Sequence, residues 1–289
     1  MRTSIFQPTT RTHARVLEEA TMTSPNCWGD ETEYDFKAIC EDLVRLLRLK
    51  ATPVGMKRFK TRKDLDDIPR IRIPDPSLKL ATDQIVGQAR WIGYTIGFTM
   101  EHLMGAQCGA VLGLHPQDEE WKSGNQFNGV WYGTLEDSAA HQGAMDCASY
   151  GDYEAMAVSP LVSGRIDNPD ICLIYATPGQ MITLINGYQY RDYKKCSFSV
   201  VGESACADSW GRALKTGEFS VSIPCYAERK FGGVQDDELL VALPPSDLPK
   251  IIAGLEALSK SGLRYPIPNH GIQLSPAASM AQSYGSKSS

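Results

Sequence analysis

The chain has 289 residues, of which 42% are hydrophobic and 22% are charged, and this balance excludes collagen-like and wholly disordered chains. A chain of this length buries roughly three quarters of the surface that it exposes when unfolded, so it needs no disulfide framework. No apolar run approaches the ~20 residues of a membrane-spanning helix, so we expect no membrane partner. The formal net charge of -5 argues against a nucleic-acid partner.

The two ends of the chain differ from its middle. Residues 1–30 show no hydrophobic period, and we expect a flexible N-terminal arm; Met1 to Pro8 lacks the apolar core of a secretory signal. Residues 276–289 are polar and low in complexity, which predicts a disordered tail. A single domain is therefore expected over residues 31–275.

The first half predicts three helices and one strand. Apolar residues at intervals of three and four predict a helix over residues 33–49, and Thr32 followed by Asp35 resembles its N-terminal cap. The other predicted elements of this half are a strand at 53–59, a charged loop at 60–77, and helices at 82–96 and 99–112. Glycines at positions 105, 109 and 113 give the last helix a glycine face, which indicates that a neighbouring helix or a cofactor approaches its backbone closely.

Residues 115–155 hold tryptophan and tyrosine among glycines without a clear period, and an irregular insert of this length is typical of a lid or binding loop. The second half is more regular. Thr177 and Gln180 form a predicted capping box at the start of a helix, Ser246 caps a final helix, and Gly262 is placed to end it. A short helix is predicted at 205–214, and strands at 156–162, 171–175, 197–201, 219–223 and 239–243. The expected fold class is α+β, or mixed α/β: a single compact domain in which a mixed sheet is flanked by helices.

The common catalytic and nucleotide-binding motifs are absent from the sequence. There is no phosphate-binding loop, no dinucleotide fingerprint and no serine elbow, and the metal-binding motifs His-Glu-x-x-His and Cys-x-x-Cys are missing as well. With only five histidines, a histidine-rich metal site is not expected. The eight cysteines are scattered over a chain much longer than the small disulfide-rich secreted scaffolds, so we expect a cytoplasmic protein with free thiols.

Three of these cysteines stand in settings that suit a metal ligand or a nucleophile. Cys108 lies among glycines, and Cys206 begins a predicted helix, where free amide groups favour a thiolate. Cys225 ends a predicted strand, with Arg229 and Lys230 close in sequence. By contrast, the apolar neighbours of Cys172 are typical of a buried core residue.

At these residues the chain resembles the domain-of-unknown-function family 169, also called the ArCR group, over roughly residues 40–265. The segments that carry the resemblance are Cys108 to Leu114, Asn168 to Tyr175, Thr177 to Met181 and Ile223 to Gly233, followed by Asp236 to Leu239 and Ala242 to Pro244. The family has no established general activity. Members of the family tend to have cysteines in the segments around Cys108, Cys206 and Cys225, so the resemblance favours a role for these three cysteines in the site. Many members also carry a cysteine where this chain reads Leu80 to Gln84, so the resemblance implies that a fourth thiolate is missing here.

If the three thiolates converge, they leave one coordination position open, unlike closed four-ligand sites. An open iron of a [4Fe-4S] cluster acts as a Lewis acid, which suits hydrolysis, hydration or dehydration of a small organic substrate, aromatic substrates included. Glu203, Glu228 and His102 are candidates for the acid or base, and Arg229 could hold a carboxylate or phenolate of the substrate.

Other interpretations of the same residues stay open. A cluster-free hydrolase would use Cys225 or Cys206 as its nucleophile, and a ligand-binding or accessory protein would have no turnover. A globular protein whose cysteines serve only packing is the plainest alternative, and in it the four acid, base and arginine candidates are structural. A homodimer is the default expectation for a chain of this size.

Overall fold

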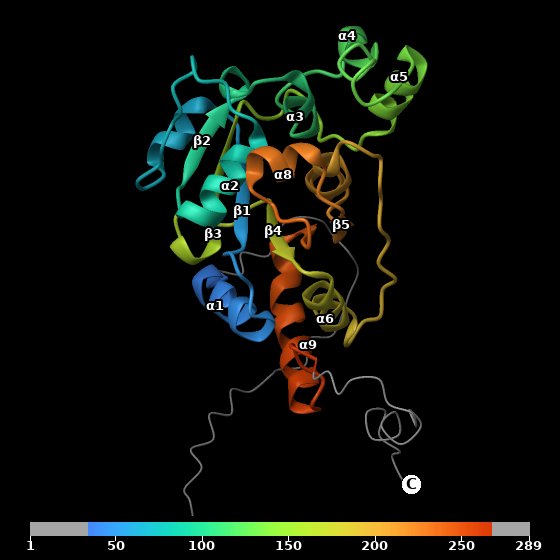
Figure 1. Cartoon of the computed structure of the whole chain (residues 1–289). Coiled ribbons are helices and arrows are strands. Elements are labelled where there is room, and N and C mark those ends of the chain that lie inside the picture. Colours follow the sequence, from blue (N-terminus) through green and yellow to red (C-terminus); the bar gives the residue numbers. More distant parts are fainter. Residues whose placement is uncertain (1–33, 268–289) are drawn as a thin grey trace, which may run out of the picture. The chain divides into compact units, whose positions relative to one another are not determined.

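A computed structural model describes residues 34–267, and these residues form a domain of α+β class. The expected N-terminal arm, its neighbouring cap residue Thr32 and the expected tail lie outside the described residues. Six strands form one sheet in the order β2-β3-β1-β4-β6-β5 (Figure 1). The strands are β1 (Val54–Phe59), β2 (Ile96–Thr99), β3 (Ala155–Pro160), β4 (Ile171–Ala176), β5 (Ser220–Ser222) and β6 (Leu239–Leu243).

Each pairing between these named strands is antiparallel, so the expectation of a mixed sheet was wrong for them. The physical reason lies in burial. All six residues of β3 and all six of β4 are buried, because helices cover both faces of the sheet. Strands buried on both faces have continuous apolar sequences, and such sequences do not reveal the direction of their neighbours.

Helices cover the two faces of the sheet in separate layers. Ile171, Leu173 and Tyr175 of β4 point into a core shared with α2, whereas Cys172 and Ile174 point into a core shared with α1, α6 and α9. The helices are α1 (Phe36–Leu47), α2 (Thr82–Ile92), α3 (Ala106–Val111), α4 (Glu119–Lys122), α5 (Leu135–Ala144), α6 (Pro178–Gln189), α7 (Arg212–Thr216), α8 (Tyr226–Gly232) and α9 (Leu248–Lys260). Because successive residues of β4 face opposite sides of the sheet, the domain has three layers, with helices on each side of the sheet.

Several elements agree with the sequence patterns. The Asp35 side chain accepts a hydrogen bond from the Ala38 amide at 3.0 Å and so caps α1. The predicted capping box is present at the start of α6, where the Thr177 amide donates to Gln180 Oε1 at 2.7 Å. Strand β6 begins and ends where the sequence predicted it.

The predicted helix over residues 99–112 was wrong. Thr99 ends β2, a 3-10 turn covers Met100–His102, and only Ala106–Val111 is α-helical. Gly105 precedes this short helix and Gly113 follows it with a φ of 77°, so the glycines do not share a helix face. A Cβ added to Gly109 would lie 2.3 Å from the sulfur of Met100, so the Met100 side chain makes a close approach there.

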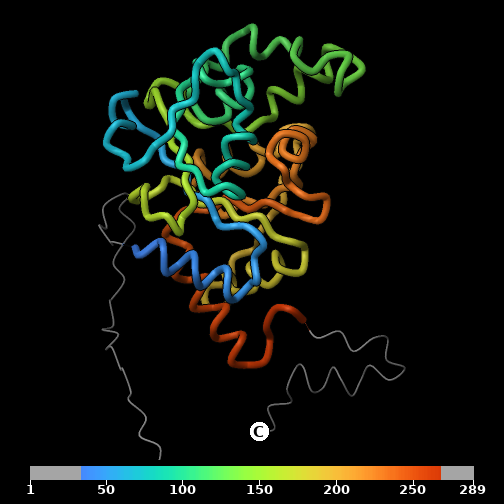
Figure 2. Tube along the Cα trace, turned by 60° about the vertical axis from the view of Figure 1, so that its left-hand side comes forward, coloured from blue at the N-terminus to red at the C-terminus, as the bar shows by residue number. Residues whose placement is uncertain are grey.

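The second half also contains differences from the sequence patterns. The predicted strand 197–201 is reduced to one bridge between Phe198 and Val221. The predicted helix that begins at Ala205 forms, but a π-helical turn at Ala207–Gly211 interrupts it before α7. Residues 115–154 contain α4 and α5, and these two helices stand away from the sheet at one end of the domain (Figures 1 and 2).

Candidate functional site

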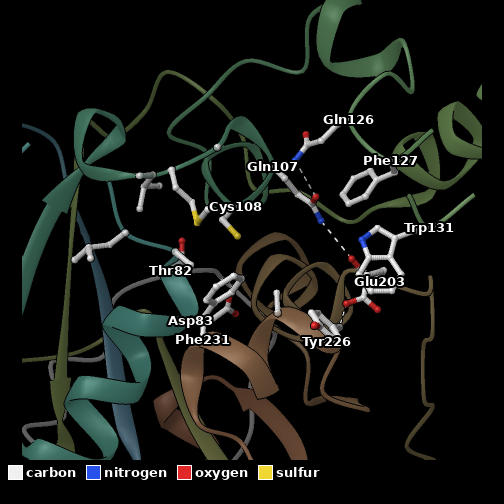
Figure 3. A pocket seen from close by; sticks show the side chains of 16 residues that line it. Thr82, Asp83, Gln107, Cys108, Gln126, Phe127, Trp131, Glu203, Tyr226 and Phe231 are labelled. Atoms are coloured by element: carbon white, nitrogen blue, oxygen red, sulfur yellow. Dashed lines mark hydrogen bonds between the residues drawn. The ribbon is translucent and has the colours of Figure 1, made fainter. Parts of the chain in front are cut away.

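An open pocket of about 300 Å³ lies where four stretches of the chain meet (Figure 3). They are the start of α2, the segment from Leu103 into α3, the insert around Phe127, and the region where Glu203 meets α8. Its lining is Leu80, Ala81, Thr82, Asp83, Leu103, Met104, Gly105, Gln107, Cys108, Gln126, Phe127, Trp131, Glu203, Tyr226, Ala227 and Phe231. A mainly apolar pocket with a few polar groups is the usual form of a small-molecule site.

Close packing of α8 on α2 builds the inner side of this pocket. A Cβ added to Gly87 would lie 2.5 Å from the carbonyl oxygen of Gly232, so only glycine allows the two helices to approach this closely. The contact places the first turn of α2, with Asp83, beside the α8 residues Glu228 and Gly232. Cys225 is the N-cap residue of α8 and is carried to the same place.

The three cysteines singled out from the sequence lie near one another, and one of them lines the pocket. Cys108 lines the pocket, and its side chain makes a hydrogen-bonding contact with that of Cys206. Cys225 is near enough for its charge to act on Cys206. Cys206 and Cys225 are buried, with 3% and 7% of their surface exposed, so of the three thiols only that of Cys108 is partly exposed.

The environment of the two inner thiols disfavours their ionised forms. The hydrogen bond to Cys108, together with burial, raises the pKa of Cys206 well above its ordinary value. Burial, and next the Glu228 carboxylate, raise the pKa of Cys225. For the Cys206 thiol, the neighbouring Cys108 and burial therefore oppose the thiolate that the helix start would favour. Both thiols are protonated at neutral pH and are weak nucleophiles in this state.

Two buried carboxyl groups accompany the cysteines. Asp83 is 4% exposed and lines the pocket, and burial, then the charge of Glu203, raise its pKa to about 6. Glu228 is fully buried; burial, and next the Asp83 carboxylate, raise its pKa well above the ordinary value. Within residues 34–267 neither carboxyl oxygen of Glu228 has a hydrogen-bond partner of ordinary geometry. The site thus places several acidic groups where water is excluded. Burying their charged forms costs free energy unless a positive charge compensates.

Arg90 is the cation that opposes these carboxyl groups, but it is already paired. Its guanidinium contacts Glu238 at 2.9 Å, and both side chains are almost fully buried. Arg90 also stacks on Tyr175, with 3.7 Å between the guanidinium carbon and the ring centre. Among the described residues, no three histidine, cysteine or acidic side chains are arranged to hold a metal ion as they stand.

The remaining residues singled out from the sequence have different positions. Glu203 lines the pocket, and its Oε1 accepts a hydrogen bond from the Tyr226 amide at 2.5 Å. His102 is 1% exposed, is absent from the pocket lining, and its Nδ1 accepts a hydrogen bond from the Thr99 amide at 3.0 Å. Arg229 also lies outside the lining and pairs with Asp236 at 3.3 Å. Of these residues, Glu203 lines the pocket and Glu228 acts on Cys225, whereas His102 and Arg229 lie outside the pocket lining, although the Arg229 Nε donates to the Cys225 carbonyl oxygen at 3.5 Å.

The insert covers one side of the pocket, as the sequence indicated. Gln126 donates a hydrogen bond to Gln107 Oε1 at 3.2 Å, and Gln107 in turn donates to the Glu203 carbonyl oxygen at 3.5 Å (Figure 3). Gln107 also donates to the Ser204 hydroxyl, so the insert is tied to the segment that carries Cys206. Trp131 packs near Tyr226, with 5.3 Å between the ring centres. Trp121, in contrast, is 5% exposed and belongs to the core.

Sequence reasoning missed Asp83 and the whole of α8. An acidic residue in the first turn of a helix is ordinary, because it interacts favourably with the helix N-terminus, so nothing in the sequence marked Asp83 as buried beside sulfur. A seven-residue helix with glycine at its end is too short to give a hydrophobic period. Only the neighbouring Cys225 gave a signal in that region.

One known protein family matches the part of the chain that holds these residues. The family model described as uncharacterised ArCR, a domain of unknown function, matches residues 42–254, a range that includes Asp83 and all three site cysteines. Neither the curated proteins nor the solved structures contain a match to the chain. In the described part of the chain no helix is both long and apolar enough to cross a membrane. Since the match covers most of the chain, the protein belongs to the domain-of-unknown-function family 169, the uncharacterised ArCR family, as the sequence motifs had indicated.

Proposed function

We propose that this protein is an enzyme in which Cys108, Cys206 and Cys225 hold a [4Fe-4S] cluster, and that it hydrolyses, hydrates or dehydrates a small organic substrate. The observation that supports the proposal is that Cys206 and Cys225, from separate stretches of the chain, lie close to Cys108, which lines an open pocket. Each cluster ligand binds a different iron, so the sulfurs need not surround a single point. Three protein ligands would leave one iron of the cluster without a protein ligand.

The donor set fits such a cluster chemically. Thiolate is the usual protein ligand of iron-sulfur clusters, and coordination deprotonates a thiol even where burial disfavours the free thiolate. When bound, the cluster would supply an iron that polarises a carbonyl, hydroxyl or halide, or that holds an activated water.

The three acidic residues of the site would have different roles in the reaction. Asp83 lines the pocket and is buried, so its carboxyl group is placed to give a proton to the substrate or take one from water. Glu203 also lines the pocket, but one of its oxygens is held by the Tyr226 amide. Glu228 is outside the pocket lining and its charge raises the pKa of Cys225, so it would act on the site electrostatically and not by contact with the substrate.

The test is the iron and sulfide content of the protein after expression and purification without oxygen. We expect about four irons and four sulfides per chain, with broad absorption in the visible range. Replacing Cys108, Cys206 or Cys225 singly by serine should abolish iron retention. Asp83→Asn should keep the iron and lower turnover by about a hundredfold or more, the scale of a lost acid or base.

Cys172→Ser is the matched control, because Cys172 is fully buried in β4 and points into the core on the other face of the sheet. We expect it to keep the iron and to lose about 1–3 kcal/mol of stability through a poorly satisfied buried hydroxyl. A wild-type protein that is iron-free after this preparation and yet active would contradict the proposal.

A second candidate is a cluster-free enzyme with a cysteine nucleophile. The partial exposure of Cys108 on the pocket favours this residue over Cys206 and Cys225, whose thiols are buried. It requires that alkylation of Cys108 alone abolishes turnover, and that serine at positions 206 and 225 leaves turnover intact.

A further inference from the structure

The ionisable side chains that line the pocket can carry only negative charge. Its ionisable side chains are those of Asp83, Glu203, Cys108 and Tyr226, and no lysine, arginine or histidine is among the lining residues. Asp83 is nine-tenths buried, and the only hydrogen bond that its carboxyl group accepts within the described residues comes from its own backbone amide. An anionic substrate would meet repulsion here and find no partner, whereas a cation would be attracted.

The outer part of the pocket combines a carboxylate with aromatic rings. The rings of Trp131 and Tyr226 lie 5.3 Å apart, and Glu203 is held beside them by the Tyr226 amide (Figure 3). That hydrogen bond uses one carboxylate oxygen, and it fixes the position of the other. Phe127 and Phe231 add two more rings to the lining. Aromatic faces with an adjacent carboxylate form the common recognition site for ammonium groups.

The aromatic cluster already attracts a cation from within the chain. Lys230, which does not line the pocket, places its ammonium group 5.3 Å from the centre of the Tyr226 ring and 5.5 Å from that of Phe231. In the part of the chain that the structure describes, no lysine or arginine lies over Trp131. The Trp131 ring is therefore available to a ligand.

We infer that the pocket selects a positively charged substrate, a small amine or quaternary ammonium compound, held by Glu203 and the ring of Trp131. The reactive end of the substrate then points inward, toward Cys108 and Asp83. This inference deepens the proposed function by naming the substrate class. It replaces the expectation that Arg229 holds a substrate carboxylate, since the Arg229 guanidinium pairs with Asp236 and lies outside the lining.

The test compares three probes that share a benzene ring: benzyltrimethylammonium, neutral benzamide and anionic phenylacetate. Binding to the full-length protein, purified without oxygen, is measured by isothermal titration calorimetry. We expect the cation to bind at least about tenfold more tightly than either other probe. Glu203→Gln should remove about tenfold of that preference while keeping the acceptor oxygen for the Tyr226 amide, and Trp131→Leu should weaken cation binding about threefold or more.

The matched control is Glu119→Gln, which removes the same charge from a glutamate that is 97% exposed and outside the pocket. It should leave all three affinities unchanged. Equal binding of the three probes, tighter binding of phenylacetate, or a cation preference that survives Glu203→Gln would overturn the inference. Iron analysis of the same samples separates the two proposals: iron without cation preference defeats only the inference, and cation preference without iron defeats only the cluster.

Discussion

His141 is buried in the insert that covers the pocket, and its environment makes stability depend on pH. It packs against Phe127 and Tyr132, with ring centres 5.0 and 4.8 Å away, and within residues 34–267 neither of its ring nitrogens has a hydrogen-bond partner. Burial lowers the pKa of His141 below its ordinary value, because the charged imidazolium loses its solvation. The folded protein therefore holds this ring neutral.

The sign of the pH effect follows from proton linkage. Below the ordinary histidine pKa, about 6.5, the unfolded chain binds a proton at His141 that the folded protein does not, so stability falls as the pH falls through that value. We expect His141→Phe, which keeps the ring contacts, to lose less unfolding free energy than the wild type between pH 7.5 and 5.5. Urea unfolding at the two pH values measures this, and identical losses in both proteins would show that His141 does not contribute.

At the scale of elements, the contact between α2 and α8 decides whether the site forms. Gly87 and Gly232 let the two helices approach to backbone contact, and this approach brings Asp83 beside Glu228 and Cys225. A β-carbon at position 87 would lie 2.5 Å from a backbone oxygen, which cannot move without shifting α8. We expect Gly87→Ala to cost about 1–3 kcal/mol of unfolding free energy, the usual range for overpacking.

Gly143→Ala gives the matched comparison, because Gly143 is also helical but a β-carbon there would meet no atom within 4 Å. Alanine at that position should stabilise the protein by up to about 1 kcal/mol, since alanine favours the helix over glycine. Denaturant titration of both variants tests the pair. A Gly87→Ala protein as stable as the wild type would mean that the helices separate at no cost.

At the scale of the whole molecule, strands β4 and β6 couple the two cores. Alternate residues of each strand point into opposite cores, so neither core can lose its packing while these strands stay in place. Trp121 and Trp210 both belong to the core on the site side of the sheet. Leu43 of α1, which is fully buried, belongs to the core on the other side.

We therefore expect Leu43→Ala to lower the unfolding midpoint of tryptophan fluorescence and that of far-ultraviolet circular dichroism by the same amount. The cost should be about 2–5 kcal/mol, the usual range for a leucine deleted from a core. Ile182→Ala, at a residue of α6 that is 49% exposed, is the control and should change little. A fluorescence midpoint that stays fixed while the dichroism midpoint falls would show that the two sides unfold separately.

Local patterns were sufficient for the elements whose ends carry their own chemistry. Asp35 before α1 and the Thr177–Gln180 pair before α6 satisfy backbone amides within one turn, so the sequence alone locates these helix starts. The strand-rich second half and the α+β class follow from apolar runs of strand length. Strand direction did not follow, because β4 is buried on both faces and its sequence contains no polar alternation.

The candidate site, like the fold, was only partly predictable from local sequence. Turn positions and small neighbours marked Cys108, Cys206 and Cys225 from the sequence, since these features depend only on nearby residues. Three other features of the site depend on how α8, α2 and the insert pack together. They are the burial of Asp83 and Glu228, the raised pKa of Cys206, and the contact between the rings of Trp131 and Tyr226. Solvation and electrostatic interaction are set by distances between segments far apart in the chain, and only the tertiary structure fixes those distances.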